Sequence, residues 1–521
     1  MATRTLSTDK ESACQYEGCG RKVARDGTCI FHLPDKNPSE AEEFNSSLLA
    51  EIKKMQEDVT VEMINLNGFR FPKPAYKFPT GIRFEKAISF RGAVFEGEAE
   101  FSQSVFLGPA VFYQTKFSGN AGFDEVKLSK IASFGECEFL SDATFYNSEF
   151  STIAEFELAK FSGNALFSNC KFLGSTVFSR TKFSAHAAFH ETKFSDYSSF
   201  ESAELSGLVD FTKSKFSDKA EFAFAKFSAF AIFDNAEFLG DVFFDVVEFS
   251  GDVSFDSTKF SGIASFYNSK IAGTMRFRAT LFQTKDEQIL ASPIKKYTLF
   301  EKINVDTSGE VRFEGGVCMS RVSLHHVDIR RFGFFDVRWG RLRGRASIME
   351  HGILEERKRR SKNGEMILPD MTPEHVQQIY VRLRRNLERS AGRYPEAGDF
   401  FINEKEMRKL ILQERRRLPR SENLPEWIIL KLYGALALYG ESIMLPVFWS
   451  LVAILGFTAL KIVSFCLQTM EGKPYLDFLM ESLMAFFQLR SEPGLDILER
   501  LISVPILGSL FIALKRKFER R

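Results

Sequence analysis

Residues 110–134 read AVFYQTKFSGNAGFDEVKLSKIASF, and this stretch sets the pattern for much of the chain. Large apolar residues recur in it at alternating gaps of five and six residues: Phe112, Phe117, Phe123, Leu128 and Phe134. The same frame runs from Phe84 to Phe282, where 34 of 37 ladder positions are Phe and the others are Leu128, Leu205 and Ile271. The sequence therefore repeats every eleven residues.

A small side chain stands two residues before most ladder positions, as at Ala110, Thr115 and Ala121. Positions i−2 and i lie on the same side of an extended segment, so each pair would face one interior. The intervening Ser, Gly and Asp, as in FSGNAGF and FSDKAEF, are typical of corners and not of a helix. Periodicity of this kind indicates a solenoid, and the chain is expected to be mainly β.

The motif A-x-F-x-x-x-x-F-S-G-x resembles the pentapeptide repeats, in a Phe-rich variety. This resemblance implies a right-handed, quadrilateral parallel β-helix, and gaps of 5, 6, 5 and 6 give 22 residues per coil. Phe84 would stack under Phe106, and Phe106 under Leu128. Residues 84–282 would form about nine coils, a rod on the order of 43 Å long at about 4.8 Å per strand.

The frame is lost after Phe282, and we interpret residues 283–345 as an insertion of residues 283–312 followed by a final coil. The ladder positions of that coil would be Phe313, Cys318, Leu324, Ile329 and Phe335.

Three cysteines fall on inward positions and are interpreted as small core residues: Cys137, Cys170 and Cys318. His186 and His190 lie at odd offsets from the ladder and are expected at the surface.

Composition limits the classes of protein that remain. The 521 residues include 69 Lys+Arg and 68 Asp+Glu, a net charge of +1, which excludes a generally basic nucleic-acid binder. A hydrophobic content of 44% argues against global disorder. Seven cysteines in a chain this long favour a reducing compartment over a disulfide framework, and no apolar secretory signal opens the sequence.

Four ligand-type residues crowd the segment CQYEGCGRKVARDGTCIFH in a C-x4-C-x9-C-x2-H array: Cys14, Cys19, Cys29 and His32. Structural Zn²⁺ prefers four such ligands, and Gly18, Gly20 and Gly27 would supply tight turns between them. We predict a zinc knuckle over residues 1–38; the alternative is three incidental thiols and a surface histidine. The array also resembles the CCCH knuckle that precedes some prokaryotic pentapeptide-repeat chains.

Residues 39–83 are predicted to be a capping helix and a linker. Ser39 followed by Glu42 has the spacing of a capping box at the start of a helix. The first coil of a β-solenoid needs such a cover, because an open strand edge invites pairing with other chains.

After Trp339, Phe becomes rare and Arg and Lys become frequent. Residues 346–422 are predicted to form a basic α-helical hairpin, joined near Gly392, that resembles one tetratricopeptide unit. Its facing sides would carry Ile379, Leu383, Leu387, Ala397, Phe400 and Phe401. The basic runs form either a solvated face or a surface for anionic membrane lipids. The lipid-facing residues would be Arg415, Arg416, Arg417, Arg420, Lys515, Arg516 and Lys517.

Residues 423–521 are predicted to be an α-helical membrane domain. The run Ile443–Leu467 has one charge, Lys461, in 25 residues, enough helix to cross a bilayer, and Leu498–Leu514 would be a second span. Basic residues flank the pair, whereas residues 471–500 carry a net charge of −3. The positive-inside rule then predicts a multi-pass protein of the cell membrane with both termini cytoplasmic.

Between the spans, Tyr475–Leu489 is apolar on one side and too short to cross, which predicts a re-entrant helix ending in a Gly/Pro turn. This order of parts resembles the prokaryotic two-transmembrane ion-channel domain. The resemblance implies a tetrameric pore with a hinge at Gly508, although QLRSEPG stands where the potassium filter TVGYG would be. The pore positions would be Gln488, Arg490, Ser491 and Glu492.

Three functions fit these features. The first is a homo-oligomeric membrane pore, with a tetramer favoured, regulated by a cytoplasmic β-helix that senses a partner, ligand or tension. The second is a membrane-anchored scaffold whose β-helix faces bind another protein. The third is the DNA-mimicking topoisomerase inhibitor known among pentapeptide-repeat proteins, which the net charge of −8 over residues 84–282 favours and the apolar hairpin disfavours.

No catalytic combination of nucleophile, histidine and carboxylate and no phosphate-binding loop was recognised, so an enzyme is not expected. Membrane lipids are the expected partners, and nucleic acid is not.

Overall fold

The computed structural model describes residues 13–73, 75–77, 81–282, 298–361, 371–389, 396–415, 424–468, 474–489 and 494–519. The chain divides into two compact units, Met1–Gly340 and Arg341–Arg521, each considered separately below.

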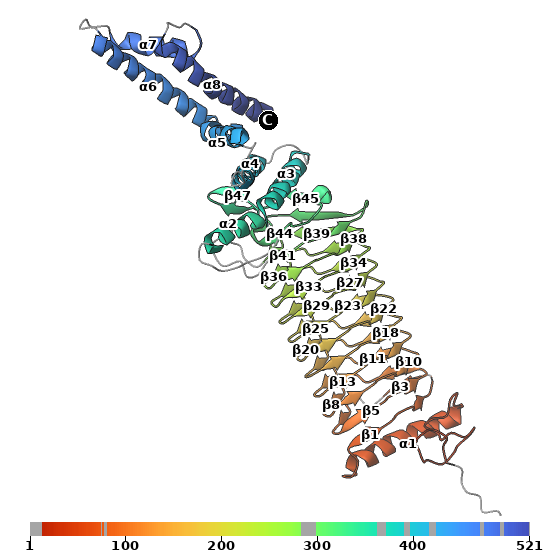
Figure 1. The fold of residues 1–521 in the computed structure, drawn as a ribbon. Coiled ribbons are helices and arrows are strands. Elements are labelled where there is room, and N and C mark those ends of the chain that lie inside the picture. The colour runs from red at the N-terminus through yellow and green to blue at the C-terminus, as the bar shows by residue number, and fades with distance from the viewer. Residues whose placement is uncertain are drawn as a thin grey trace, which may run out of the picture. The chain divides into compact units, whose positions relative to one another are not determined.

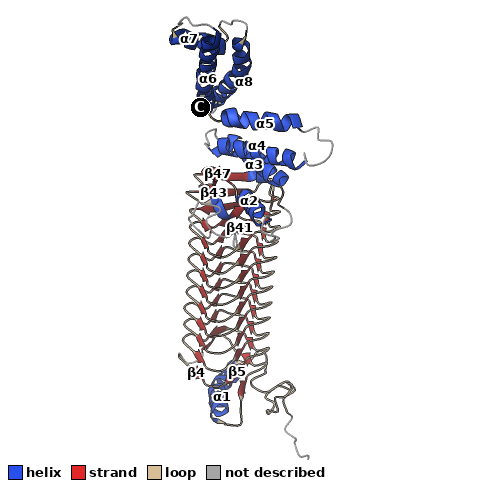
Figure 2. Cartoon of the chain, turned by 60° about the vertical axis from the view of Figure 1, so that its left-hand side comes forward, coloured by secondary structure: helices blue, strands red, loops and turns tan. Residues whose placement is uncertain are grey.

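The first unit is a parallel β-solenoid of about 11 turns, built from strands that are mostly two residues long (Figure 1). Figure 2 shows these strands stacked in columns along the solenoid. In the part of the chain that the structure describes, the columns form four sheets of 12, 11, 12 and 10 strands. The sheets run from β1 (Met63–Asn65) to β44 (Val322–Ser323), from β2 (Arg70–Phe71) to β42 (Asn304–Val305), from β3 (Ala75–Lys77) to β45 (Phe332–Phe335), and from β4 (Arg83–Phe84) to β40 (Leu281–Phe282). The predicted four-sided parallel solenoid is therefore confirmed.

Strand register confirms the coil of 22 residues. Phe84 pairs with Phe106, and Phe106 pairs in turn with Leu128. The rings of Phe84 and Phe106 stack with 4.8 Å between their centroids, which matches the separation of neighbouring strands in a sheet. Every ladder residue from Phe84 to Phe282 is at most 1% exposed, so the solenoid interior consists of stacked Phe rings.

The small residues two positions before the ladder are buried beside the rings. Several of them also donate a hydrogen bond to a main-chain carbonyl in the coil below, as Thr115 does to Phe90 at 2.8 Å. The thiols of Cys137 and Cys170 do the same to Phe112 and Phe145. Burial raises the pKa of both thiols, and Cys318 is also buried, so the interpretation of these cysteines as core residues is confirmed.

Most tight corners of the coil carry residues other than glycine, although Gly81 and Gly92 form the first two corners of the series. From Gln103 to Ala279, every eleventh residue has a positive φ of 54–63°, and the set includes Leu158, Phe224 and Val246. Each corner stacks on the next, as where the N–H of Gln103 donates to the carbonyl of Asp124 at 2.8 Å. A left-handed residue other than glycine costs about 1–2 kcal/mol, and these repeated hydrogen bonds between coils offset that cost.

The solenoid begins earlier and resumes sooner than the repeat predicted. Its first strand starts at Met63, whereas the repeat was recognised from Phe84. Beyond residues 283–297, which lie outside the described part, the strands return at β41 (Thr298–Leu299), followed by β42 and β43 (Glu310–Glu314). The predicted insertion of residues 283–312 was therefore too long, because residues 298–312 already belong to a coil.

The predicted inward position of Phe335 is wrong. Phe334 stacks on Phe313 at 5.6 Å, and Phe335 is 43% exposed. A 3-10 turn, η2 (Ile329–Arg331), precedes β45 and shortens this segment by one residue. Because side chains of a strand alternate between faces, that single residue exchanges inside and outside.

Helix α1 (Pro38–Glu57) covers the first coil with Phe44, Leu48 and Ile52. The ring of Phe44 lies 5.3 Å from that of Phe71 in β2, so the predicted capping helix is confirmed. Its cap is two residues earlier than predicted, since Asn37 and Glu40, not Ser39 and Glu42, form the capping box. Pro38 explains the shift, because proline is favoured in the first turn.

The second unit is mainly helical. Its elements, after the short strands β46 (Gly340–Leu342) and β47 (Arg345–Ser347), are α2 (Met349–Ser361), α3 (Pro373–Arg389), α4 (Glu396–Arg415), α5 (Leu424–Ala437), α6 (Met444–Gln468), α7 (Tyr475–Phe486) and α8 (Leu495–Glu519). The predicted hairpin corresponds to α3 and α4, and all six residues expected on its facing sides are buried. Its predicted joint at Gly392 lies outside the described residues.

We predict that truncating one ring of the solenoid core is costly. Phe178 stacks on Phe156 and Phe200, and Phe178→Ala should lower the free energy of unfolding by about 3–5 kcal/mol because it leaves a cavity in close-packed rings. Phe230→Ala is the matched control, since Phe230 is 40% exposed. Denaturant titration followed by far-ultraviolet circular dichroism measures both; equal losses would contradict the assignment of the interior.

Candidate functional site

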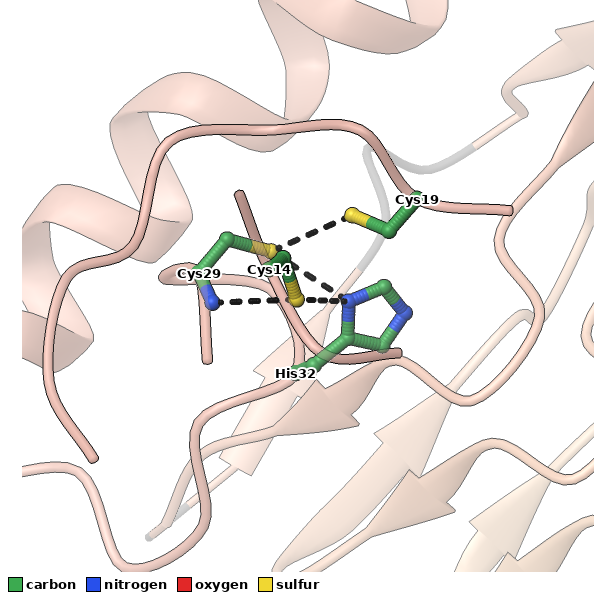
Figure 3. Close-up of side chains that lie close together, drawn as sticks. All are labelled: Cys14, Cys19, Cys29 and His32. Atoms are coloured by element: carbon green, nitrogen blue, oxygen red, sulfur yellow. Dashed lines mark hydrogen bonds between the residues drawn. The ribbon is translucent and has the colours of Figure 1, made fainter. Parts of the chain in front are cut away.

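The amino-terminal segment brings the four predicted ligand residues together (Figure 3). The Sγ atoms of Cys19 and Cys29 are 3.6 Å apart, and His32 Nδ1 lies 3.6 Å from Cys14 Sγ and 3.2 Å from Cys29 Sγ. All four ligand atoms lie within 4.8 Å of one another, close enough to surround one ion. The three glycines expected at turns, Gly18, Gly20 and Gly27, all have positive φ.

The surroundings of His32 orient its ring for a metal. Its Nε2 lies 3.0 Å from the carbonyl oxygen of Asn67, a contact that places the ring proton on Nε2 and leaves Nδ1 as the ligand atom. Tyr16 stacks on the ring at 4.0 Å. Burial lowers the pKa of His32, which favours the neutral imidazole that a metal needs.

The thiols of the cluster have opposite shifts. Burial raises the pKa of Cys29 to about 11. Burial acts in the same direction on Cys14, but hydrogen bonds from the backbone of Cys29 and Tyr16 outweigh it and leave the pKa of Cys14 below its usual value. Arg21 lies 3.7 Å from Cys19 Sγ while it pairs with Glu51 on α1, so one cation stands beside the sulfur set.

Within the described residues, two helices are long and apolar enough to cross a membrane: Met444–Leu467 of α6 and Leu495–Phe518 of α8. In the most apolar 18-residue stretch of each helix, only 22% (α6) and 28% (α8) is buried, so most of this apolar surface is uncovered in a single chain. The exposed side chains include Leu451, Leu455 and Val463 on α6, together with Leu501 and Phe511 on α8. Apolar faces of this extent need a lipid or protein environment.

The short helix α7 packs against both of these helices. Phe486 of α7 forms a small core with Ile454 of α6 and Ile506 of α8. The helix ends at Phe486, before the predicted Leu489. Of the predicted pore residues, Gln488 is described: its amide donates to the hydroxyl of Ser503 at 2.8 Å and to the carbonyl of Arg500 at 3.2 Å. Three further predicted pore residues lie outside the described part: Arg490, Ser491 and Glu492.

A buried ion cluster links α6 to α8. Lys461 Nζ lies 2.7 Å from Asp496 Oδ1 and 3.0 Å from Glu499 Oε2, and all three residues are at most 9% exposed. One lysine meets two carboxylates here. The sequence shows each of these charges, but it does not show that residues on different helices pair. The available signal was Lys461, a single charge in a long apolar run.

A second polar junction joins α4, the α5–α6 connection and the end of α8. Leu438, Tyr439 and Gly440 all have positive φ, and Tyr439 is fully buried with its hydroxyl donating to Glu406 Oε1 at 2.6 Å. Arg516 donates to the Tyr439 carbonyl at 2.9 Å, pairs with Glu441 at 3.1 Å, and lies 4.0 Å from the centre of the Phe401 ring.

The basic residues predicted to face lipid differ in their surroundings. Arg516, one of these residues, is held by Tyr439, Glu441 and Phe401. Arg415 lies 3.8 Å from Glu374. Lys515 and Lys517 are on the last turns of α8. The structure does not describe Arg416, Arg417 and Arg420.

The predicted hinge Gly508 has open space where a Cβ would be, and Pro505 stands three residues earlier inside α8. Proline removes one helical hydrogen bond, so Pro505 is a second signal in the sequence for a hinge in α8. On the solenoid, His186 and His190 are half-buried, and His190 lies near Glu191 and Asp210.

A family model described as pentapeptide repeats (9 copies) matches residues 80–127 and 156–204. Both stretches lie within the four-sided solenoid. No curated protein and no solved structure matches the chain.

We predict that Lys461→Met destabilises the second unit by about 3–5 kcal/mol, because it leaves two buried carboxylates without a cation. Lys517→Met is the matched control, since Lys517 is exposed on the last turn of α8. Denaturation of the detergent-solubilised chain, followed by the fluorescence of Trp427 and Trp449, measures the effect. Adding Asp496→Asn and Glu499→Gln to Lys461→Met should recover most of the loss; a Lys461→Met chain as stable as the control would show that the cluster is not formed.

Proposed function

We propose that this pentapeptide-repeat protein is a homo-oligomeric membrane pore whose β-solenoid regulates its carboxyl-terminal helices. The observation that carries the proposal is the position of α7, which packs against both apolar helices, α6 and α8. Twelve residues of helix reach only about 18 Å, too short to cross a bilayer, so α7 enters and returns on one side. Segments of this kind place irregular backbone at membrane depth where it lines a water-filled path.

One chain offers two spans, and two helices cannot enclose a path for ions. The uncovered apolar faces of α6 and α8 leave room for further copies beside them, and we favour four. The residues that follow α7 would then form rings around the axis, with Gln488, Arg490, Ser491 and Glu492 at its mouth. Rings of side-chain charge select ions by sign, which is the role proposed for Arg490 and Glu492.

The junction at Tyr439 supports regulation. Arg516 lies near the end of α8, and Phe401 and Glu406 belong to α4, so the second span is tied to the helices that precede the membrane. A displacement of α4 would therefore act on α8 through Arg516. In this proposal both termini and the solenoid are cytoplasmic, with basic residues on the same side as the anionic lipid surface.

Ion flux from liposomes that contain the full chain tests the pore. We expect ion flux from the native chain. The reversal potential should move toward the equilibrium potential of the cation in Arg490→Gln and toward that of the anion in Glu492→Gln, because each change removes one ring of charge. Arg330→Gln, an exposed charge on the solenoid, should change neither flux nor selectivity. A correctly inserted oligomer without flux across a range of voltages would contradict the pore and support the scaffold hypothesis.

We also propose that Cys14, Cys19, Cys29 and His32 hold a structural Zn²⁺. Three thiolates and one imidazole form a closed tetrahedral set, and separations of 3.2–3.6 Å between ligand atoms suit Zn–S bonds of about 2.3 Å. The ion would fix the turns of a segment that packs on α1 and Phe69. Its role would be to hold the cover of the first coil.

Cys29→Ser should remove this zinc, because it breaks the closed ligand set, and should expose residues 13–36 to protease. Metal analysis of the purified chain and limited proteolysis are the measurements. Cys466→Ser is the matched control, as Cys466 is an exposed cysteine on α6. Equal zinc content in both variants would refute the assignment.

A further inference from the structure

A second group of ligand-type residues lies on the solenoid, near its last turn. Glu301 follows β41 and His325 follows β44, and the pairing of Leu299 with Ser323 puts these two residues at equivalent positions in successive coils. One carboxylate oxygen of Glu301 and one ring nitrogen each of His325 and His326 lie within 4.8 Å of one another. The two imidazole rings are 3.9 Å apart between centroids.

The coil geometry explains why these three side chains converge. Stacked coils bring equivalent residues to about the strand spacing of 4.8 Å, so Glu301 and His325 are neighbours although 24 positions separate them in the sequence. His326 has a φ of 53°, the left-handed corner conformation seen throughout the solenoid. That corner turns the chain at His326 and sets its ring beside that of His325.

Lys302, a lysine at this corner, has a partner of its own. Lys302 is the counterpart of His326 one coil earlier, and its Nζ donates to the hydroxyl of Tyr267 at 2.9 Å. The same ammonium lies 5.0 Å from the centre of the Tyr267 ring. The Lys302 ammonium is therefore hydrogen-bonded to Tyr267, and its charge acts on the Glu301 carboxylate only through space.

We propose that Glu301, His325 and His326 form a binding site for a divalent transition-metal ion of the Zn²⁺ class. Two imidazoles and one carboxylate are a donor set that suits zinc, nickel or cobalt. Three protein ligands leave at least one coordination position to water or an exchangeable ligand. The half-buried to exposed position of the three residues gives an ion direct access from solvent. In these respects the site differs from the sulfur-rich amino-terminal cluster.

The site stands near the end of the solenoid, where two of its four sheets have already ended. Among the described residues, the sheet that starts with β4 ends at β40, and the sheet that starts with β2 ends at β42. Two 3-10 turns, η1 (Met319–Arg321) and η2, occupy the last turn. A metal held by Glu301 from one coil and by two histidines from the next joins these coils by bonds that do not depend on strand pairing. Binding should therefore stabilise the last turn.

Metal titration of the full chain in detergent, after treatment with a chelator, tests the proposal. We expect two Co²⁺ ions per chain, of which one gives the intense thiolate-to-cobalt absorption and the other does not. The double variant His325→Asn/His326→Asn should lose the ion without thiolate absorption and keep the other. Glu301→Gln should lower the affinity for this histidine-dependent ion by about tenfold or more. His190→Asn, a half-buried histidine beside Glu191 and Asp210, is the matched control and should bind as the native chain does.

The variants separate the two sites whatever the fate of the zinc knuckle. Cys29→Ser should lose the thiolate absorption and retain the histidine-dependent ion. Circular dichroism checks that the His325→Asn/His326→Asn chain keeps the solenoid. A folded double variant that binds as many ions, as tightly, as the His190→Asn control would overturn the proposal, as would a native chain that binds only the thiolate-ligated ion.

Discussion

The first unit depends on the match between two distances. Neighbouring strands of a parallel sheet are about 4.8 Å apart, and stacked Phe rings in successive coils lie 4.9 Å apart at Phe134 and Phe156 and 4.6 Å apart at Phe139 and Phe161. Because ring stacking and strand pairing are satisfied by the same rise, a Phe at each ladder position stabilises both. The coil length is then fixed at 22 residues, as the pairing of Phe84 with Phe106 and of Phe106 with Leu128 shows.

This constraint explains how much of the fold could be predicted. The ladder spacing gives the coil length, the four faces and the buried partner of nearly every Phe, since all depend on the period alone. It does not give the corner conformation: Leu158 and Val246 have positive φ although neither residue favours it, because hydrogen bonds to the next coil hold the backbone. Nor does it give the place of Phe335, which depends on whether the preceding segment forms a strand or a 3-10 turn.

The candidate sites differ in predictability for a related reason. The four ligands of the amino-terminal cluster lie within nineteen residues, so their spacing alone brings them together. The partners of Lys461 are on another helix, and Glu301 meets His325 only because one coil stacks on another. Contacts of the second kind need the register of the fold. The single charge in an apolar run was still a signal, since an unpaired lysine there would cost several kcal/mol.

In the second unit, charged side chains link one helix to another. Lys461 joins α6 to α8 at one end, and Arg516 joins α8 to α4 and to the α5–α6 connection at the other. The connection itself has three consecutive left-handed residues, of which Leu438 and Tyr439 are not glycine. Such a backbone persists only where its surroundings fix it, and here Glu406 and Arg516 supply those contacts. Release of either contact would let the connection relax, so this junction is the part of the second unit where a change in α4 would most readily alter the position of α8.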